Sequence, residues 1–121
     1  MRYFGIILIG IALYLFFAYR KPKNVKQIGG DEAKAMQEAG ATIVDVRSKR
    51  EFDEGHIPGS INIPIGSSDF IPMLPKDRNS PIIVYCRSGA RASSFEKTIL
   101  QEGYTNLYHL GSLNKWTGPI E

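Results

Sequence analysis

The stretch that decides the fold of this chain is PIIVYCRSGAR, residues 81–91. Pro81 to Tyr85 are apolar and rich in β-branched residues without alternation, which is typical of a strand buried on both faces of a parallel sheet. Cys86 follows, then a short loop of small and basic residues, and then a predicted helix from about Ala92 to Glu102. A strand that leads through a loop into a helix indicates an α/β sheet, in which ligands bind at the carboxyl ends of the strands.

Cys86 is the only cysteine among the 121 residues, so the chain has no internal disulfide and no cysteine-rich metal site. Backbone N–H groups and the dipole at a helix N-terminus both favour a negative charge. Arg87 and Arg91 add positive charge, and Gly89 allows the loop to curl with its amides inward. A lone cysteine is more often an inert buried residue, but this setting favours a reactive thiolate.

The remaining chain from residue 27 onward alternates between predicted strands and helices. Asp31 is placed to cap one helix, and Ser48 with Glu51 has the capping-box pattern that opens a shorter one. The predicted helices span 31–39 and 48–54, the predicted strands span 42–46, 60–63 and 106–110, and residues 66–75 form a loop or irregular turns. This order predicts an α/β fold with a parallel sheet flanked by helices on both faces.

The loop CRSGAR at 86–91 resembles the active-site loop of the rhodanese family. Other stretches match the same family: DVR at 45–47 with Glu51-Phe52, GHIPGSINIP at 55–64, and Gly111, Leu113 and Trp116. The resemblance covers nearly all of a predicted rhodanese-like domain at 27–121. It departs from the family pattern at Ala90, where many members have Asn, and at Ser112, where many have a second Gly.

The resemblance implies sulfur transfer by double displacement. Cys86 would attack the outer sulfur of a donor such as thiosulfate, and the resulting persulfide would pass its sulfur to a thiol or cyanide acceptor. The residues expected to bind the substrate are Arg87, Ser88, Gly89, Ala90, Arg91 and Ala92. Arg87 and Arg91 are expected to attract anionic donors, and Arg91 also to brace the loop. No metal and no organic cofactor is required.

Three other functions are considered. A phosphatase or arsenate reductase would place its phosphate-binding arginine one position later than Arg91, and the shorter loop here suits a single sulfur atom better. A sulfur carrier would load sulfur at Cys86 but release it poorly without its partner. A catalytically silent interaction domain is disfavoured because Cys86 is intact. The carrier is the leading alternative to the sulfurtransferase.

Asp45, Arg47 and His56 are predicted to be structural residues near the site. Asp45 is expected to be a buried hydrogen-bonding carboxylate, and Arg47 to pair with Glu51 four residues along the short helix. His56 invites a Cys–His dyad, but it lies in the GHIPG turn, which the resemblance marks as structural. His109 carries no distinguishable signal.

The N-terminal segment differs from the rest. Residues 3–19 contain no charge and would form a helix about 26 Å long, at the short end for a bilayer span. We predict a transmembrane helix at 1–20, in preference to a cleaved signal peptide, and a basic juxtamembrane linker at 21–26. Four basic residues follow the apolar segment against Arg2 before it, which predicts a single-pass membrane protein with a cytoplasmic domain.

The basic excess of the chain is confined to that segment. The net charge is +3, but the first 26 residues carry five basic residues and no acid, which leaves ten basic and twelve acidic residues in the rest. Nucleic-acid binding needs a clustered basic face, so no nucleic-acid partner is predicted. Too few histidines are present for a histidine-dominated metal site, and no metal is predicted.

Overall fold

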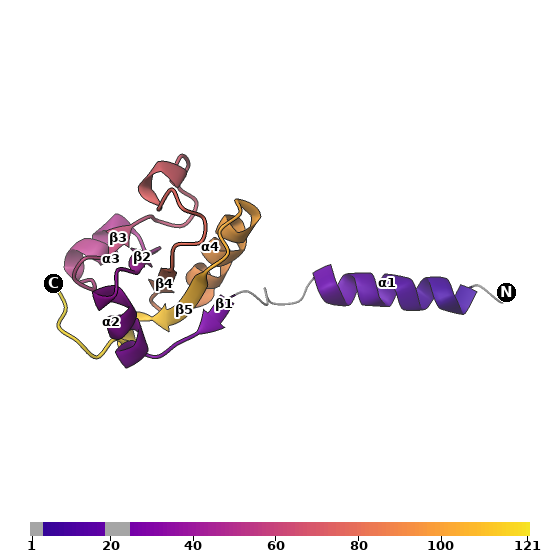
Figure 1. Ribbon diagram of the computed structural model, residues 1–121, viewed down its shortest axis with the longest axis horizontal. Coiled ribbons are helices and arrows are strands. Elements are labelled where there is room, and N and C mark those ends of the chain that lie inside the picture. The colour runs from indigo at the N-terminus through magenta and orange to yellow at the C-terminus, as the bar shows by residue number, and fades with distance from the viewer. Residues whose placement is uncertain (1–3, 19–24) are drawn as a thin grey trace.

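The computed structural model describes residues 4–18 and 25–121 (Figure 1). An isolated helix, α1, spans Phe4–Ala18, and the other elements form a five-stranded sheet with its covering helices. In chain order these are β1 Val25–Gln27, α2 Gly30–Glu38, β2 Thr42–Asp45, α3 Lys49–Glu54, β3 Ile61–Asn62, a 3-10 turn Ile71–Met73, β4 Ile82–Cys86, α4 Ala90–Gln101, β5 Leu107–Ser112 and a 3-10 turn Leu113–Lys115. The strand order is β1-β5-β4-β2-β3 and all pairs are parallel. The predicted α/β fold is therefore confirmed.

The two faces of the sheet carry separate hydrophobic clusters, and Figure 1 shows α2 and α4 on opposite sides of the strands. Ala92, Phe95 and Ile99 of α4 pack on one face, together with Cys86. Ala33 of α2 packs on the other face. All five residues of β4 are buried because this central strand is covered on both sides, which explains its unbroken apolar sequence.

The connection that follows β4 and the connection that follows β2 run in opposite directions across the sheet. The chain leaves β4 through α4 toward β5, and it leaves β2 through α3 toward β3. Since such crossovers are right-handed, α4 and α3 are placed on opposite faces. The carboxyl ends of β2 and β4 therefore flank a topological switch point, where ligands of open α/β sheets bind.

The first strand corrects one predicted boundary. The basic linker was predicted at 21–26, but Val25 and Lys26 belong to β1, which pairs in parallel with β5. Three residues at a sheet edge are too few to show a hydrophobic pattern, so the sequence gives no signal for this strand. Residues 21–24 of the predicted linker lie outside the described residues.

The predicted transmembrane helix is not confirmed. The 15 residues of α1 span about 22 Å, whereas the hydrocarbon core of a bilayer is about 30 Å thick. No helix within residues 4–18 and 25–121 has both the length and the apolar character that a membrane span requires. The basic residues that set the predicted orientation, Arg2, Arg20, Lys21 and Lys23, lie outside the described residues.

Candidate active site

Cys86 ends β4 at the switch point, and its side chain is fully buried. The chain turns immediately after it, and Gly89 adopts φ 105°, a left-handed conformation that glycine tolerates without strain. This turn directs the Gly89 N–H back to the cysteine, where it donates a hydrogen bond to Sγ at 2.9 Å. The loop is therefore closed around the sulfur by its own backbone.

Gly89 is also the N-cap of α4, which begins at Ala90 and not at the predicted Ala92. The first-turn amides of a helix have no intrahelical acceptor, so those of Ala90, Arg91 and Ala92 are available beside the loop. Arg87, Ser88 and Ala90 are exposed, Arg91 is half-buried and Ala92 is buried. The six predicted loop residues form the turn after Cys86 and the first turn of α4, and the helix N-terminus adds a favourable environment for negative charge.

Arg91 is tied to the helix on the other side of the switch point. Its Nη1 and Nη2 atoms bond Glu51 Oε1 and Oε2 at 2.7 and 3.0 Å, which makes a bidentate ion pair. The hydrogen bonds from Arg91 lower the pKa of Glu51 to about 2, so this carboxylate stays ionised at neutral pH. Glu51 also completes the capping box with Ser48 at the start of α3, as predicted. Arg91 therefore fixes the cysteine loop to α3.

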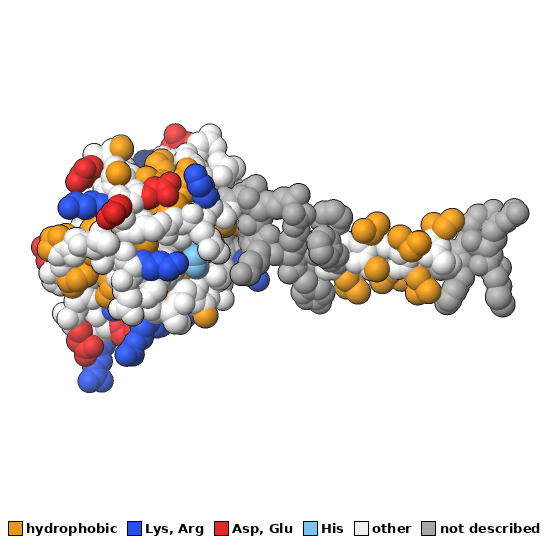
Figure 2. All heavy atoms as spheres, turned by 90° about the horizontal axis from the view of Figure 1, so that it is seen from below, with side chains coloured by type: hydrophobic (Ala, Val, Ile, Leu, Met, Phe, Trp, Pro, Cys, Tyr) orange, Lys and Arg blue, Asp and Glu red, His pale blue; other side chains and the backbone are white. Residues whose placement is uncertain are grey.

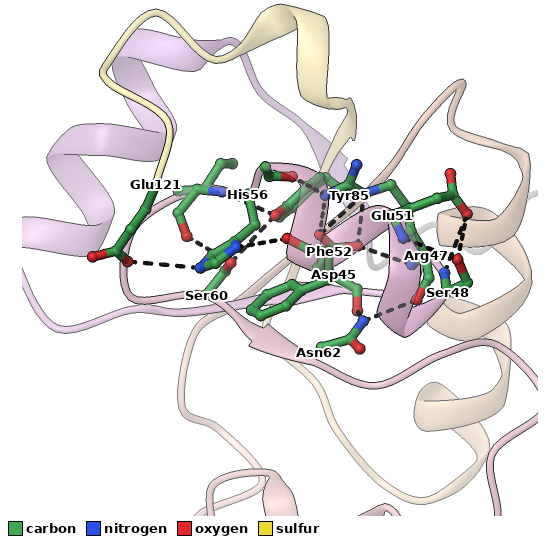
Figure 3. A network of polar contacts seen from close by, with 12 residues as sticks. Asp45, Arg47, Ser48, Glu51, Phe52, His56, Ser60, Asn62, Tyr85 and Glu121 are labelled. Atoms are coloured by element: carbon green, nitrogen blue, oxygen red, sulfur yellow. Dashed lines mark hydrogen bonds and ion pairs between the residues drawn. The ribbon is translucent and has the colours of Figure 1, made fainter.

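The predicted Arg47–Glu51 pair is wrong. Arg47 bonds Asp45 instead, with Nη2 2.6 Å from Oδ2 and Nε 3.0 Å from both carboxylate oxygens, and it also donates to the carbonyl of Gly55 (Figure 3). Arg47 precedes the N-cap Ser48, so it is not on the helix and the spacing rule for helical pairs does not apply. Asp45 is completely buried, as predicted, and an unpaired charge there would be costly.

His56 contacts Phe52 and Glu121, and Figure 3 shows its side chain between these two residues. Its ring stacks on Phe52 at a centroid distance of 3.7 Å, and Nδ1 is 2.8 Å from the Phe52 carbonyl. Nε2 lies 3.6 Å from a carboxylate oxygen of Glu121. These contacts join α3 to the segment at 119–121, and they do not form a Cys–His dyad.

A cavity of about 430 Å³ opens next to the loop. It is lined by residues of α3 and its two flanks, of the cysteine loop and of the segment after β5: Arg47, Glu51, Glu54, Gly55, Arg87, Leu113, Asn114 and Ile120. This volume exceeds that of a small oxyanion and lies in the range of ordinary ligand sites. Arg87 forms no ion pair within residues 4–18 and 25–121, so it contributes an uncompensated positive charge to the opening.

Two features of the site were missed from the sequence. Ser112 donates its hydroxyl to the carbonyl of Arg87 at 2.8 Å, which holds the start of the loop against the end of β5. The buried Glu96 pairs with the partly buried His109, with Glu96 Oε2 2.7 Å from His109 Nδ1. The available signal was that Glu96 shares the inner face of α4 with Ala92 and Ile99.

A buried cysteine at the switch point of a parallel sheet, enclosed by a short loop at a helix N-terminus, defines a cysteine-centred α/β protein. Comparison with known proteins then gives the family. The model of the rhodanese-like domain matches residues 30–119, and the chain belongs to the rhodanese-like family.

Among curated proteins, the thiosulfate sulfurtransferase GlpE of Stutzerimonas stutzeri is 37% identical over 95 residues, covering 77% of this chain and 85% of that protein. The uncharacterized protein YqhL of Bacillus subtilis is 28% identical over 122 residues, covering 96% of this chain and 92% of that protein. A rhodanese structure from E. coli, described as containing anions, has a TM-score of 0.63 at 26% identity and covers 68% of this chain and 98% of its own. The relatives therefore include sulfurtransferases.

Proposed function

We propose that this protein is a sulfurtransferase that moves sulfane sulfur from thiosulfate, or a related donor, to a thiol or cyanide through a persulfide on Cys86. The observation that carries this proposal is the hydrogen bond from the Gly89 N–H to Cys86 Sγ at the end of β4. A backbone donor aimed at sulfur stabilises a thiolate, which is the nucleophilic form of cysteine. The matched GlpE proteins are named thiosulfate sulfurtransferases, which supports the choice of donor.

In the first half-reaction, the Cys86 thiolate attacks the outer sulfur of thiosulfate. A bond forms between Sγ and that sulfur, the sulfur–sulfur bond of the donor breaks, and sulfite leaves with the electron pair. In the second, the acceptor attacks the outer sulfur of the persulfide, and Cys86 leaves as a thiolate. The amides of Gly89 and of the first turn of α4 stabilise the negative charge at each stage.

Arg87 and Arg91 have different roles in this proposal, although both were expected to attract anions. Arg87 is exposed at the mouth of the cavity, so it attracts an anionic donor. Arg91 is held in a bidentate pair by Glu51, which offsets its charge. Arg91 therefore acts by holding the loop in place.

The test is intact-protein mass spectrometry after exposure of the chain to thiosulfate, with Cys86→Ser as the control. We expect a gain of one sulfur that is removed by cyanide or a thiol and is absent in the variant. A chain that gains no sulfur from thiosulfate would contradict the proposed donor. Thiocyanate formation, measured separately, then reports turnover.

A sulfur-carrier role is the second candidate. It is favoured by the complete burial of Cys86, because a persulfide on a buried sulfur is shielded from small acceptors in solution. A carrier would show full sulfur loading by mass but little thiocyanate formation. Rapid turnover with cyanide would exclude it.

We infer from the same chain that α1 attaches the domain to a membrane, with the domain on the cytoplasmic side. The support is the exposure of its large apolar side chains, from Ile6 at 64% to Leu15 at 45%, on a helix without charged residues (Figure 2). Flotation of the full chain with phospholipid vesicles, compared with a chain that lacks residues 1–24, is the test. Equal recovery of both in the unbound fraction would contradict attachment.

A further inference from the structure

The Glu96–His109 pair is a buried titratable group that the sulfur-transfer scheme does not use. Glu96 is on α4 and His109 is on β5, two elements that lie side by side in Figure 1. Glu96 is only 4% exposed, and its Oε2 is 2.7 Å from His109 Nδ1. A buried carboxyl group is unusual in a protein because desolvation disfavours its ionised form.

The imidazole of His109 lies against the glycines that shape the cysteine loop. A methyl group built on Gly89 would be 3.5 Å from His109 Nε2, and one built on Gly111 would be only 2.7 Å away. The irregularity in the pairing of β4 with β5, where Val84 faces His109 but Tyr85 faces Gly111, falls at this point. The ring thus lies next to Gly89, the residue whose N–H is bonded to Cys86 Sγ.

Few titratable groups accompany the pair on the elements around it: Cys86 and Tyr85 on β4, Lys26 on β1, Tyr108 on β5, and Arg91 and Lys97 on α4. Both tyrosines pack in the cluster on the opposite face of the sheet. Both Lys26 and Arg91 are in ion pairs with other residues, and Lys97 is exposed. Within residues 25–121, Cys86 and Tyr104 are therefore the titratable groups in the buried cluster on the α4 face, and the Tyr104 hydroxyl is bonded to the Pro75 carbonyl.

The protonation state of the pair decides its charge. Burial raises the pKa of Glu96 to about 8, so the pair retains a proton at neutral pH. With that proton shared between carboxyl and imidazole, the pair has no net charge. Once the proton is lost, a carboxylate remains beside a neutral imidazole, and the net charge is −1.

We propose that Glu96 and His109 are a positioning pair for the cysteine loop. His109 packs beside Gly89, and the proton that the two residues share keeps the pair without net charge while the sulfur on Cys86 is anionic. Two nearby negative charges oppose each other, so loss of the proton from the pair and formation of the thiolate are mutually unfavourable. The proposal rests on the proposed function only in assigning the sulfur to Cys86.

The experiment is the rate of alkylation of Cys86 by iodoacetamide in the full chain, measured by intact mass from about pH 6 to about pH 10. Replacement of Glu96 by Gln removes the charge that appears at alkaline pH. We expect Glu96→Gln to react like the unmodified chain near the acid end, and up to about threefold to tenfold faster in the range where the pair has lost its proton but the thiol is not fully ionised, which is the effect of one nearby unit charge.

The matched control is Glu102→Gln, which removes an exposed carboxylate at the end of the same helix and should leave the profile unchanged. Identical profiles for Glu96→Gln, Glu102→Gln and the unmodified chain would overturn the proposal. This readout does not depend on the sulfur donor. A chain that fails to load sulfur from thiosulfate but shows the expected alkylation profiles would contradict only the proposed function.

A second measurement needs no change in the pair itself. The imidazole resonances of His109 are followed by NMR against pH in the unmodified chain and in Cys86→Ser. We expect the inflection to move to lower pH in the variant, because a neutral serine no longer opposes loss of the proton from the pair. An inflection at the same pH in both proteins would contradict the coupling.

Discussion

The cysteine loop is held by two charged pairs that differ in every physical respect. On its outer side, Arg91 and Glu51 form a half-exposed pair whose carboxylate has a pKa near 2 and is ionised at all ordinary pH values. On its inner side, the buried Glu96, whose carboxyl has a pKa of about 8, pairs with the partly buried His109. Both involve α4, with Arg91 and Glu96 only about a turn and a half apart. Exposure to solvent therefore distinguishes the Arg91–Glu51 pair, whose charge is fixed, from the Glu96–His109 pair, whose charge can change with pH.

The difference follows from what stabilises each carboxylate. Glu51 accepts two hydrogen bonds from a guanidinium and others from Ser48, and such bonds favour the charged form. Glu96 is removed from water, and burial favours the neutral form. Burial therefore allows the inner carboxyl to change its protonation state near neutral pH, whereas the outer carboxyl stays ionised.

The largest effect on stability is expected from Gly111→Ala, which disturbs the Glu96–His109 pair through a steric clash with the imidazole. Gly111 has φ 85°, and its added methyl group would lie 2.7 Å from the imidazole of His109. Backbone strain and overpacking together should lower the free energy of unfolding by about 2 to 4 kcal/mol. Chemical denaturation measures the change.

Gly103→Ala is the matched control for that substitution. Gly103 has a similar φ of 94°, but a methyl group there meets nothing within 4 Å, so only the strain of about 1 kcal/mol remains. Equal losses in the two variants would show that the imidazole does not crowd Gly111. Adding His109→Ala should remove the excess loss from Gly111→Ala.

The next effect is the pH dependence of stability that the inner pair imposes. The pKa of Glu96 is raised from 4.5 to about 8 on folding, so the folded chain retains a proton that the unfolded chain has lost. The unfolded histidine keeps its own proton up to about pH 6.5, so the folded pair holds an extra proton only above that pH, and stability should fall as the pH rises from about 6.5 to about 8. Glu96→Gln should abolish this decline and stabilise the chain at about pH 9 by roughly 1 to 2 kcal/mol, since the imidazole offsets part of the cost.

Thermal unfolding of both proteins across this range provides the measurement. Glu102→Gln again serves as the control, because its exposed carboxylate should leave the slope unaltered. If the chain with Glu96→Gln loses stability with rising pH as steeply as the unmodified chain, Glu96 is not the group responsible.

These two pairs also mark the limit of what the sequence could predict. The strand, the cysteine and the helix of residues 81–101 are local patterns, so they were predicted nearly to their boundaries. Glu51 and Arg91 are 40 residues apart, and a helical spacing rule assigned Glu51 to Arg47 instead. That rule failed because Arg47 precedes the helix and is drawn into a buried pair with Asp45.

His109 illustrates the same limit on the inner side. A single histidine on a strand has no periodic signature, and its partner is 13 residues away on another element. Only packing of α4 on the sheet brings them together, and packing cannot be read from local propensity. Family resemblance did not help either, because none of the matching stretches includes Glu96 or His109.

Breaking the outer pair should change the stability less than the two changes on the inner side. Glu51→Gln removes a half-exposed ion pair and should lower the free energy of unfolding by about 1 kcal/mol at neutral pH. The depressed pKa of Glu51 means that this contribution is present above about pH 4.5 and is lost as the pH falls toward about 2. Glu54→Gln, which removes an exposed partner of Arg50, should change the stability little.

Acid denaturation of both variants tests this expectation, and sulfur loading shows whether the clamp matters for function. Loading of Glu51→Gln should slow because Arg91 no longer fixes the loop. Loading at the unmodified rate, despite the lost stability, would mean that the inner pair alone holds the loop.

The smallest effect is expected from Ser112→Ala, which tests whether the loop also needs a tie at its start. Ser112 donates its hydroxyl to the Arg87 carbonyl at 2.8 Å and accepts from the Asn114 N–H at 3.2 Å, and it is partly exposed. Water can replace these bonds, so the loss should be about 0.5 to 1 kcal/mol. Denaturation midpoints measure it, and Ser94→Ala on the exposed side of α4 is the control. A loss of stability larger than that of Glu51→Gln would mean that the main restraint on the loop is the bond at the Arg87 carbonyl and not either charged pair.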